Sequence, residues 1–205
     1  MDALVMQAMA KWPNVPHCYG WLALDARGNW RMRDEHAQAG NLPGDRINSE
    51  ALLTFIHRNY ACDERGRWYF QNGPQRVYVT LEITPFIART DPVHGFILHT
   101  GAPASTIESA WMTHDGELVL VQDGVPAAVD NHDIAQCLPL LRLDGAAASD
   151  DAVTGWLAGT DEAKRDTMTL QLANVAVPVR RIAREALATQ FGFVAEPRPD
   201  DRDKP

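Results

Sequence analysis

Short stretches in which apolar and polar residues alternate dominate the first half of the chain, and they predict β-hairpins. Residues 21–25 and 29–33 alternate around a turn at Ala26-Arg-Gly28. Residues 68–70 and 76–83 alternate in the same way around Asn72-Gly73-Pro74. Successive side chains of a strand point to opposite faces, so Arg31 and Arg33 are expected to share one face of their strand.

Further strands and four helices follow from the same patterns. Hairpins are expected at 86–99 and 111–124, with strand alternation at 168–172 and a bulge near Asn174. Loops are expected at 34–46, 101–106 and 144–151. Helical spacing of apolar residues covers four segments: 2–11, 49–58, 133–141 and 179–191.

A short turn motif recurs along the chain. Asp25-Ala-Arg-Gly28-Asn-Trp30 matches Asp63-Glu-Arg-Gly66-Arg-Trp68, and Asp115-Gly116-Glu-Leu118 is a shortened third copy. The spacing suits a turn: Asp bonds to the backbone, Gly supplies a positive φ, and a large apolar residue returns the strand to the core. A hairpin followed by a short helix also occurs twice, which suggests two related units.

These patterns predict an α+β fold of two related β-rich units, each a hairpin plus a short helix, with antiparallel sheets and flanking N- and C-terminal helices. Five segments are expected: an N-terminal helix and linker at 1–18, a first unit at 19–100, a second unit at 101–143, a strand and helix segment at 144–196, and a disordered tail at 197–205.

Charge and cysteine content exclude several classes of protein. Residues 1–100 hold 10 Lys+Arg and 10 Asp+Glu, whereas residues 101–205 hold 9 and 17, which gives the net charge of −8. An acidic second half argues against nucleic-acid binding. The three cysteines, Cys18, Cys62 and Cys137, form no CxxC pair, so neither a disulfide framework nor a zinc site is expected. No apolar run is long enough for a membrane span, and we expect a cytoplasmic protein.

Catalytic motifs are absent from the sequence. It contains no HExxH, GxSxG, GxGxxG or P-loop pattern, so no catalytic residue, metal or cofactor is predicted. One alternative remains open: His94, His99, His114 and His132 would serve a metal-assisted hydrolase if the fold brought them together.

Aromatic residues and arginine concentrate around the 72–74 turn, which makes it the candidate ligand site. The candidates are Tyr69, Asn72, Gln75, Arg76 and Tyr78. Alternation places Trp68 and Phe70 in the core and the two tyrosines on the opposite face, where stacked rings and a guanidinium suit a planar or anionic ligand. The alternative interpretation is cross-strand pairing that only stabilises the sheet.

The order of these motifs resembles a known family. Asp63-x-x-Gly66-x-Trp68-x-Phe70 followed by Gln75-Arg-Val-Tyr-Val-Thr-Leu-Glu-Ile-Thr-Pro-Phe86 is similar to DUF1285, a bacterial family of unknown function, and closer still to DUF2946. The resemblance spans about Tyr19 to Leu141, and the chain from Asp144 fits DUF1285 less well. It implies an α+β fold of two repeated β-rich units and a signalling or ligand-binding role, and it supplies no catalytic residue.

Three hypotheses of function follow. The first is a non-enzymatic regulatory module that binds a small molecule or a protein, with no nucleic-acid or membrane partner. The second is the metal-assisted hydrolase. The third is a structural homodimer formed through exposed sheet edges.

Overall fold

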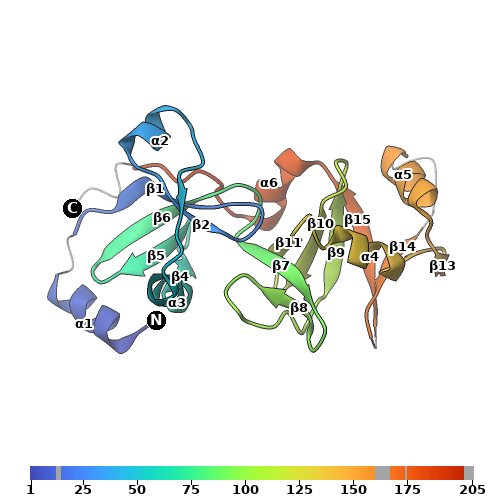
Figure 1. Cartoon of the computed structure of the whole chain (residues 1–205), viewed down its shortest axis with the longest axis horizontal. Coiled ribbons are helices and arrows are strands. Elements are labelled where there is room, and N and C mark those ends of the chain that lie inside the picture. Colours follow the sequence, from blue (N-terminus) through green and yellow to red (C-terminus); the bar gives the residue numbers. More distant parts are fainter. Residues whose placement is uncertain (13–14, 160–166, 174, 201–205) are drawn as a thin grey trace. The chain divides into compact units, whose positions relative to one another are not determined.

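The computed structural model describes residues 1–12, 15–159, 167–173 and 175–200. The chain forms two compact units: unit 1 consists of Met1–Pro85 with the segment from Gly192 onward, and unit 2 is Phe86–Phe191 (Figure 1). The α+β class, the two sheets and the helices near both ends are confirmed. The break falls after Pro85 and not after residue 100, because the strands that follow Pro85 pair within the second sheet.

Unit 1 contains one six-stranded sheet in the order β3-β2-β1-β6-β5-β4. Its strands are β1 (Cys18–Leu24), β2 (Trp30–Met32), β3 (Asp45–Arg46), β4 (Tyr60–Cys62), β5 (Trp68–Asn72) and β6 (Gln75–Leu81). The two predicted hairpins, β1–β2 and β5–β6, are present. They join through a parallel β1–β6 pair, so the sheet that was expected to be antiparallel is mixed.

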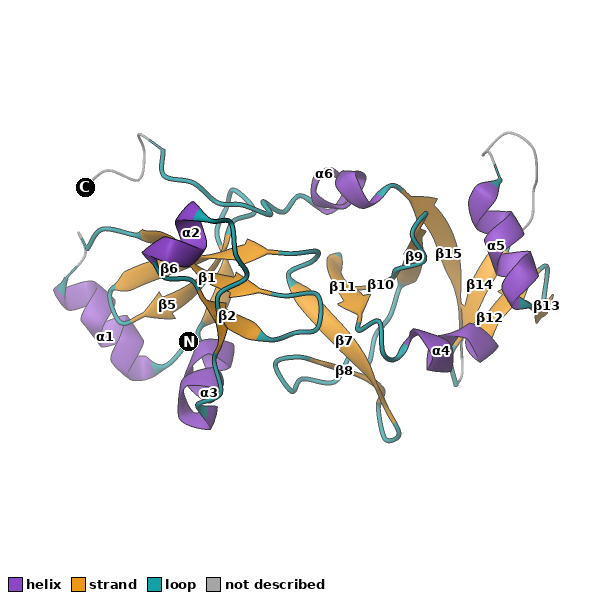
Figure 2. Ribbon diagram, turned by 45° about the horizontal axis from the view of Figure 1, so that its top comes forward, coloured by secondary structure: helices purple, strands orange, loops and turns teal. Residues whose placement is uncertain are grey.

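The helices of unit 1 are α1 (Ala3–Lys11), α2 (Glu35–Ala39) and α3 (Glu50–Arg58) (Figure 2). Helix α3 begins as predicted, with the Ser49 hydroxyl accepting a hydrogen bond from Leu52 N. Its Phe55 ring packs edge-on against Phe70 of β5, with centroids 5.4 Å apart. Helix α2 and strand β3 replace part of the loop expected at 34–46, because both are too short to show a hydrophobic period.

Unit 2 contains one nine-stranded sheet in the order β13-β12-β14-β15-β9-β10-β11-β7-β8. Its strands are β7 (Phe86–Asp91), β8 (Gly95–Leu98), β9 (Ser109–Thr113), β10 (Leu118–Gln122), β11 (Val125–Val129), β12 (Leu141–Leu143), β13 (Ala146–Ala147), β14 (Met168–Gln171) and β15 (Ala176–Ile182). The β7–β11 and β9–β15 pairs are parallel, so this sheet is mixed as well.

The helical elements of unit 2 are α4 (Ile134–Cys137), η1 (Leu138–Leu140), α5 (Asp150–Ala158), η2 (Arg184–Ala186) and α6 (Leu187–Phe191). The loop expected at 144–151 instead holds β13 and the start of α5, where the Ser149 hydroxyl accepts from Ala152 N. The helix expected at 179–191 is a strand as far as Ile182, because β15 pairs with β9 far away in sequence. The bulge expected near Asn174 lies outside the described residues.

The turn motif forms the same structure three times. The three copies begin at Asp25, Asp63 and Thr113. In each copy the carbonyl oxygen of the first residue accepts a hydrogen bond from the N–H of the glycine three residues later. The N–H of the first residue donates to the carbonyl oxygen of the residue four positions later. The third copy is therefore full length with Thr in the place of Asp, and is not the shortened copy at Asp115. The glycines have φ values of 76–86°, as this turn requires. The larger repeat of hairpin and helix stays a prediction.

Residues 192–200, called here the C-terminal segment, pack against the rest of unit 1. Val194 N donates to Gly66 O at 2.9 Å, and Leu81 N donates to Ala195 O at 2.8 Å. Pro197 is buried. The tail expected to be disordered from residue 197 is thus packed as far as residue 200, and residues 201–205 lie outside the described part. Within the described chain, no helix is long and apolar enough to cross a membrane.

Candidate functional site

The two tyrosines of the predicted ligand site are buried. Tyr69 has 6% and Tyr78 1% of its surface exposed. Phe70 on the other face is also buried, whereas Trp68 is only partly buried. The tyrosines therefore do not line an open groove, and their burial agrees with the alternative interpretation of cross-strand pairing.

The tyrosines belong to a packed aromatic and arginine cluster. Tyr78 stacks on Tyr19 of β1, with ring centroids 4.7 Å apart and planes inclined by 12°. Tyr69 meets Tyr78 edge-on at 5.8 Å. The guanidinium carbon of Arg76 lies 4.6 Å from the Tyr69 ring centre, and that of Arg67 lies 4.5 Å from the Tyr78 ring centre. Such contacts stabilise the sheet face.

Asp63 connects this cluster to the recurring turn. Its carboxylate accepts hydrogen bonds from the backbone of Arg65 and Arg67, from Arg67 Nε at 2.8 Å and from the Tyr78 hydroxyl at 3.0 Å. Burial disfavours the charged carboxylate, but the hydrogen bonds from Arg67, Arg65 and Tyr78 outweigh burial and hold the pKa of Asp63 below its usual value. The ion pair with Arg67 is therefore permanent at neutral pH.

The other two predicted residues lie apart from the cluster. Asn72 is exposed at the hairpin turn, and Gln75 Nε2 donates to Pro16 O at 2.9 Å. The fold thus brings Tyr69, Arg76 and Tyr78 together, and it places Asn72 and Gln75 at the turn. Arg67 and Asp63 complete the cluster. The sequence pattern had indicated only that they belong to a turn.

A hollow lies on the same sheet face, over β2, β1 and β6, where Arg31, Ala23 and Thr80 are paired neighbours. We call it the β2–β6 groove. Its volume is about 430 Å³, and its lining residues are Ala23, Leu24, Asp25, Arg31, Arg33, Asn41, Leu42, Pro43, Thr80, Leu81, Glu82 and Glu196. A second hollow of about 250 Å³ shares Arg33, Asn41, Thr80 and Glu196 with it and continues to Tyr19 and the C-terminal segment. The two hollows therefore adjoin at these shared residues.

One wall of the groove is held rigidly by Arg33. Its Nε donates to Leu42 O at 3.0 Å and its Nη2 to Asn41 Oδ1 at 3.2 Å. Gln38 of α2 in turn donates from Nε2 to Arg33 O at 3.0 Å. Gly20 admits this packing, since a Cβ atom there would lie 2.7 Å from Gln38 Oε1. The loop after α2 therefore has a fixed shape.

Charges of both signs face the groove. On the β2 side, Arg31 Nε contacts Asp25 Oδ2 at 2.9 Å, so these two charges neutralise each other and Arg33 remains as the net cation. Burial of Asp25 is outweighed by hydrogen bonds from Asn29, Arg31 and Arg27, which lower its pKa. A separate pair of carboxylates, Glu82 and Glu196, lies on the β6 side.

Those two carboxylates are anchored to β6. Glu82 directly follows the strand, and its Oε2 accepts from Ala26 N at 2.9 Å. Glu196 follows Ala195, whose carbonyl accepts from Leu81 of β6. Its contact with Arg198 at 3.2 Å is largely exposed to solvent, and such surface pairs contribute little. The lining of the groove thus includes Arg33 from the end of β2 and two carboxylates from the end of β6 and the C-terminal segment.

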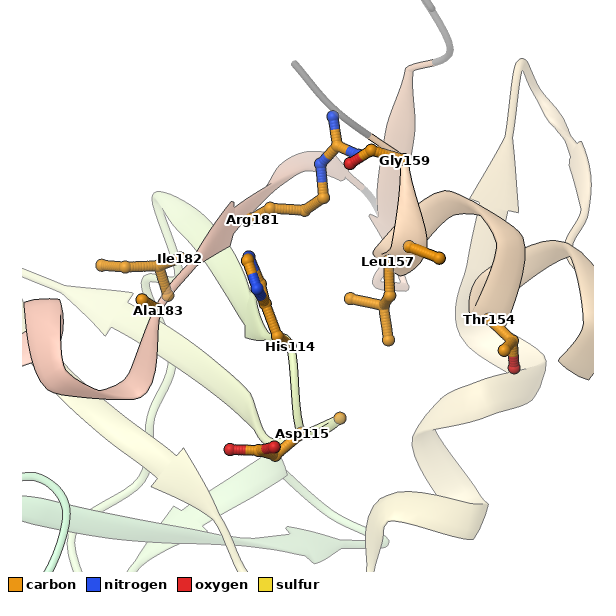
Figure 3. Close-up of a pocket in the computed structure, with 10 residues that line it drawn as sticks. His114, Asp115, Thr154, Leu157, Gly159, Arg181, Ile182 and Ala183 are labelled. Carbon is orange, nitrogen blue, oxygen red and sulfur yellow. The ribbon is translucent and has the colours of Figure 1, made fainter. Parts of the chain in front are cut away.

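A larger hollow of about 970 Å³ lies in unit 2 between α5 and the ends of β9 and β15 (Figure 3). The guanidinium of Arg181, which lines this hollow, donates to the carbonyl oxygens of Trp156 and Gly159 and stacks on the Trp156 ring. Arg181 therefore caps the C-terminal end of α5. The His114 ring and the Asp115 carboxylate project in different directions (Figure 3). The charged side chains labelled in Figure 3 therefore do not point to one common position in the hollow.

The four candidate metal histidines do not converge. His94 Nδ1 lies 3.0 Å from Asp91 in the β7–β8 turn, and His99 Nδ1 accepts a hydrogen bond from Ile87 N at 3.2 Å. His114 lies in the β9–β10 turn, and His132 lies in the turn between β11 and α4. In the ranges that the structure describes, no group of three or more His, Cys, Asp or Glu side chains is placed to hold a metal. The metal-assisted hydrolase requires such a group of ligands, so the described residues give it no support.

The described cysteines are poor nucleophiles. Desolvation, and secondarily the charge of Asp63, raises the pKa of Cys62 to about 11. Desolvation, and secondarily Asp133, raises the pKa of Cys137 to about 12. Since the thiolate is the reactive form, both thiols are almost wholly protonated at neutral pH.

Comparison with known proteins identifies a family without an assigned activity. Residues 1–198 match the family described as "Protein of unknown function (DUF2946)". A DUF1285 family protein from Silicibacter pomeroyi DSS-3 aligns at 15% identity over 87% of this chain and 94% of its own, with a TM-score of 0.49. Another from Shewanella baltica OS155 aligns at 13% identity over 58% and 87%, with a TM-score of 0.38. No curated protein matches.

Proposed function

The chain belongs to the DUF2946 family of proteins of unknown function, and we propose that it is a non-enzymatic binding module whose ligand site is the β2–β6 groove. One observation carries this proposal: side chains of both charges line the groove, and the two hydrogen bonds of Arg33 fix the shape of the loop beside it. A volume of about 430 Å³ also falls within the usual range for small-molecule sites, roughly 300–1,000 Å³.

The chemistry of the lining supports binding and not catalysis. A general acid or base works best when its pKa lies near the working pH. Asp25 has a lowered pKa and four donors around its carboxylate, so it acts as a fixed charge. The described residues that line the groove include no histidine or cysteine. Fixed charges that cannot exchange protons serve recognition.

A screen of charged metabolites by saturation-transfer NMR tests the proposal. We expect at least one ligand whose signal is lost in Thr80→Met, which narrows the groove floor, and reduced in Arg33→Gln. Arg58→Gln is the matched control, because Arg58 is exposed and lies on α3, on the opposite face of the sheet. Ligands that bind all three variants equally would contradict the proposal.

The homodimer is the remaining alternative from the sequence. The edge strands of the unit 1 sheet, β3 and β4, are only two and three residues long and offer few main-chain groups for pairing. No feature of the groove requires a second copy, so the binding module is the function that we argue.

A further inference from the structure

We infer that the ligand of the β2–β6 groove is a small monocarboxylate with a short apolar body, a proposal that rests on the binding function above. Arg33 has only neutral partners within the described chain: its Nε donates to Leu42 O and its Nη2 to Asn41 Oδ1. A guanidinium has five N–H donors, so three remain, two of them on Nη1. Arg33 lines both hollows and therefore offers them a positive charge with donors to spare.

Two more hydrogen-bond donors line the same place. Asn41, in the loop after α2, and Thr80, on β6, line both hollows as Arg33 does. Because Asn41 Oδ1 accepts from Arg33, the amide nitrogen of Asn41 is the end left for a ligand. Within the described chain, neither this nitrogen nor the Thr80 hydroxyl donates to a protein acceptor. Donors from three separate segments thus line the junction of the two hollows, which suits an anion.

Arg33 is the one cation lining the two hollows that no described carboxylate neutralises. The other lining arginines are paired: Arg31 Nε lies 2.9 Å from Asp25 Oδ2, and Arg198 Nη2 lies 3.2 Å from Glu196 Oε2. A single negative charge on the ligand therefore complements the lining, whereas a second negative charge would find no free cation.

A carboxylate fits this lining better than a phosphate monoester. A carboxylate has one negative charge at neutral pH, whereas a phosphate monoester has about 1.5–2. The extra charge would lie among the lining carboxylates, of which Glu82 is held in place by Ala26 N at 2.9 Å. Nη1 and Nη2 of Arg33 each keep an N–H donor, so they can bind both oxygens of a planar carboxylate.

The remaining lining suits a short apolar body. The apolar residues that line only the larger hollow are Ala23, Leu24, Leu42, Pro43 and Leu81. The polar side chains beside them are engaged, Asp25 with Arg31 and Glu82 with Ala26 N. A ligand whose carboxylate lies at Arg33 can therefore place an alkyl chain against the apolar residues. Each methylene buried there should raise the affinity about fourfold.

Isothermal titration with butyrate, hexanoate, hexanamide and hexyl phosphate tests this inference. We expect hexanoate to bind about 15-fold more tightly than butyrate, because it buries two more methylenes. It should bind about tenfold or more tightly than hexanamide, which has the same shape without the charge, and more tightly than hexyl phosphate. Arg33→Gln should remove the advantage of hexanoate over hexanamide. Thr80→Val, which leaves the hydrogen bonds of Arg33 in place, should reduce that advantage, and Arg58→Gln should not change it.

Each other outcome is decisive. If hexanamide, butyrate or hexyl phosphate binds as tightly as hexanoate, the monocarboxylate inference fails. If none of the four binds while another metabolite binds in a manner that Thr80→Met prevents, the inference also fails and the binding module stands. If neither these compounds nor other metabolites bind, both proposals fail. Thermal unfolding of every variant, followed by circular dichroism, shows that a loss of binding does not come from a loss of folding.

Discussion

The hydroxyl group of Tyr78 donates a hydrogen bond to the Asp63 carboxylate at 3.0 Å and accepts one from Arg67 at 2.9 Å. All three side chains are almost completely buried. Tyr78 therefore links strand β6 to the turn at Asp63 in the interior of unit 1. The Tyr78 ring is closed to a ligand, whereas the neighbouring β2–β6 groove is open.

Replacing Tyr78 by phenylalanine removes only the hydroxyl. Asp63 and Arg67 each lose a buried partner, and we expect the free energy of unfolding to fall by about 1–3 kcal/mol in urea denaturation. Tyr69→Phe is the control, since its hydroxyl has no hydrogen bond to the described residues, and it should cost less than about 0.5 kcal/mol. Equal losses in the two variants would refute the role of the Tyr78 hydroxyl.

Stability should depend on the ionisation of Asp63. Its folded pKa is lowered, so the stabilisation is fully present above the unfolded pKa of about 3.9 and is lost as the pH falls through the folded value. The difference in unfolding free energy between the native chain and Asp63→Asn should therefore be constant from pH 7 to 5 and shrink below about pH 4. A difference that stays constant down to pH 2 would contradict this.

Gly66 is required both by its backbone angle and by the C-terminal segment. Its φ is +76°, and a Cβ atom would lie 2.0 Å from Gly192 O. Gly66→Ala should lower stability and expose the C-terminal segment to limited proteolysis. Gly116→Ala, at the equivalent turn with φ +86° and nothing within 4 Å, should cost only the strain of a left-handed residue, about 1–2 kcal/mol. The same protease resistance in both variants would disprove the packing role of Gly66.

Arg76 was predicted as a ligand contact, and the structure stacks it on Tyr69 at 4.6 Å. Arg76→Met should lower the unfolding free energy by about 0.5–1 kcal/mol through loss of the cation–π contact. It should leave ligand affinity at the groove unchanged, because Arg76 is not among the groove residues. A loss of affinity equal to that of Arg33→Gln would restore the original assignment of the site to the hairpin.

The hairpins were predictable because their information is local. Alternation and turn residues define β1–β2 and β5–β6 within about 15 residues of chain each. Alternation also shows which residues share a face, but it does not show what covers that face. Tyr69 and Tyr78 were correctly placed on one side, yet their burial depends on Tyr19 and two arginines and was not visible in the local pattern.

The groove was partly visible in the sequence. Arg31 and Arg33 were expected on one face of their strand, and both line the groove. The opposite wall was not predictable, because it requires the parallel pairing of β1 with β6 and the return of Glu196 from the far end of the chain. Pairings over such sequence distances leave no periodic signal at either partner.

Chemical-shift mapping of ¹⁵N-labelled protein, titrated with each charged metabolite detected in the saturation-transfer screen, is the decisive test of the β2–β6 groove as the ligand site. We expect the largest amide shifts in the groove, at Ala23, Asn41 and Thr80, and we expect these shifts to be smaller in Arg33→Gln at the same ligand concentration. Shifts centred on the Asn72–Arg76 turn or on His114 in unit 2, or shifts of unchanged size in Arg33→Gln, would contradict the proposed groove site.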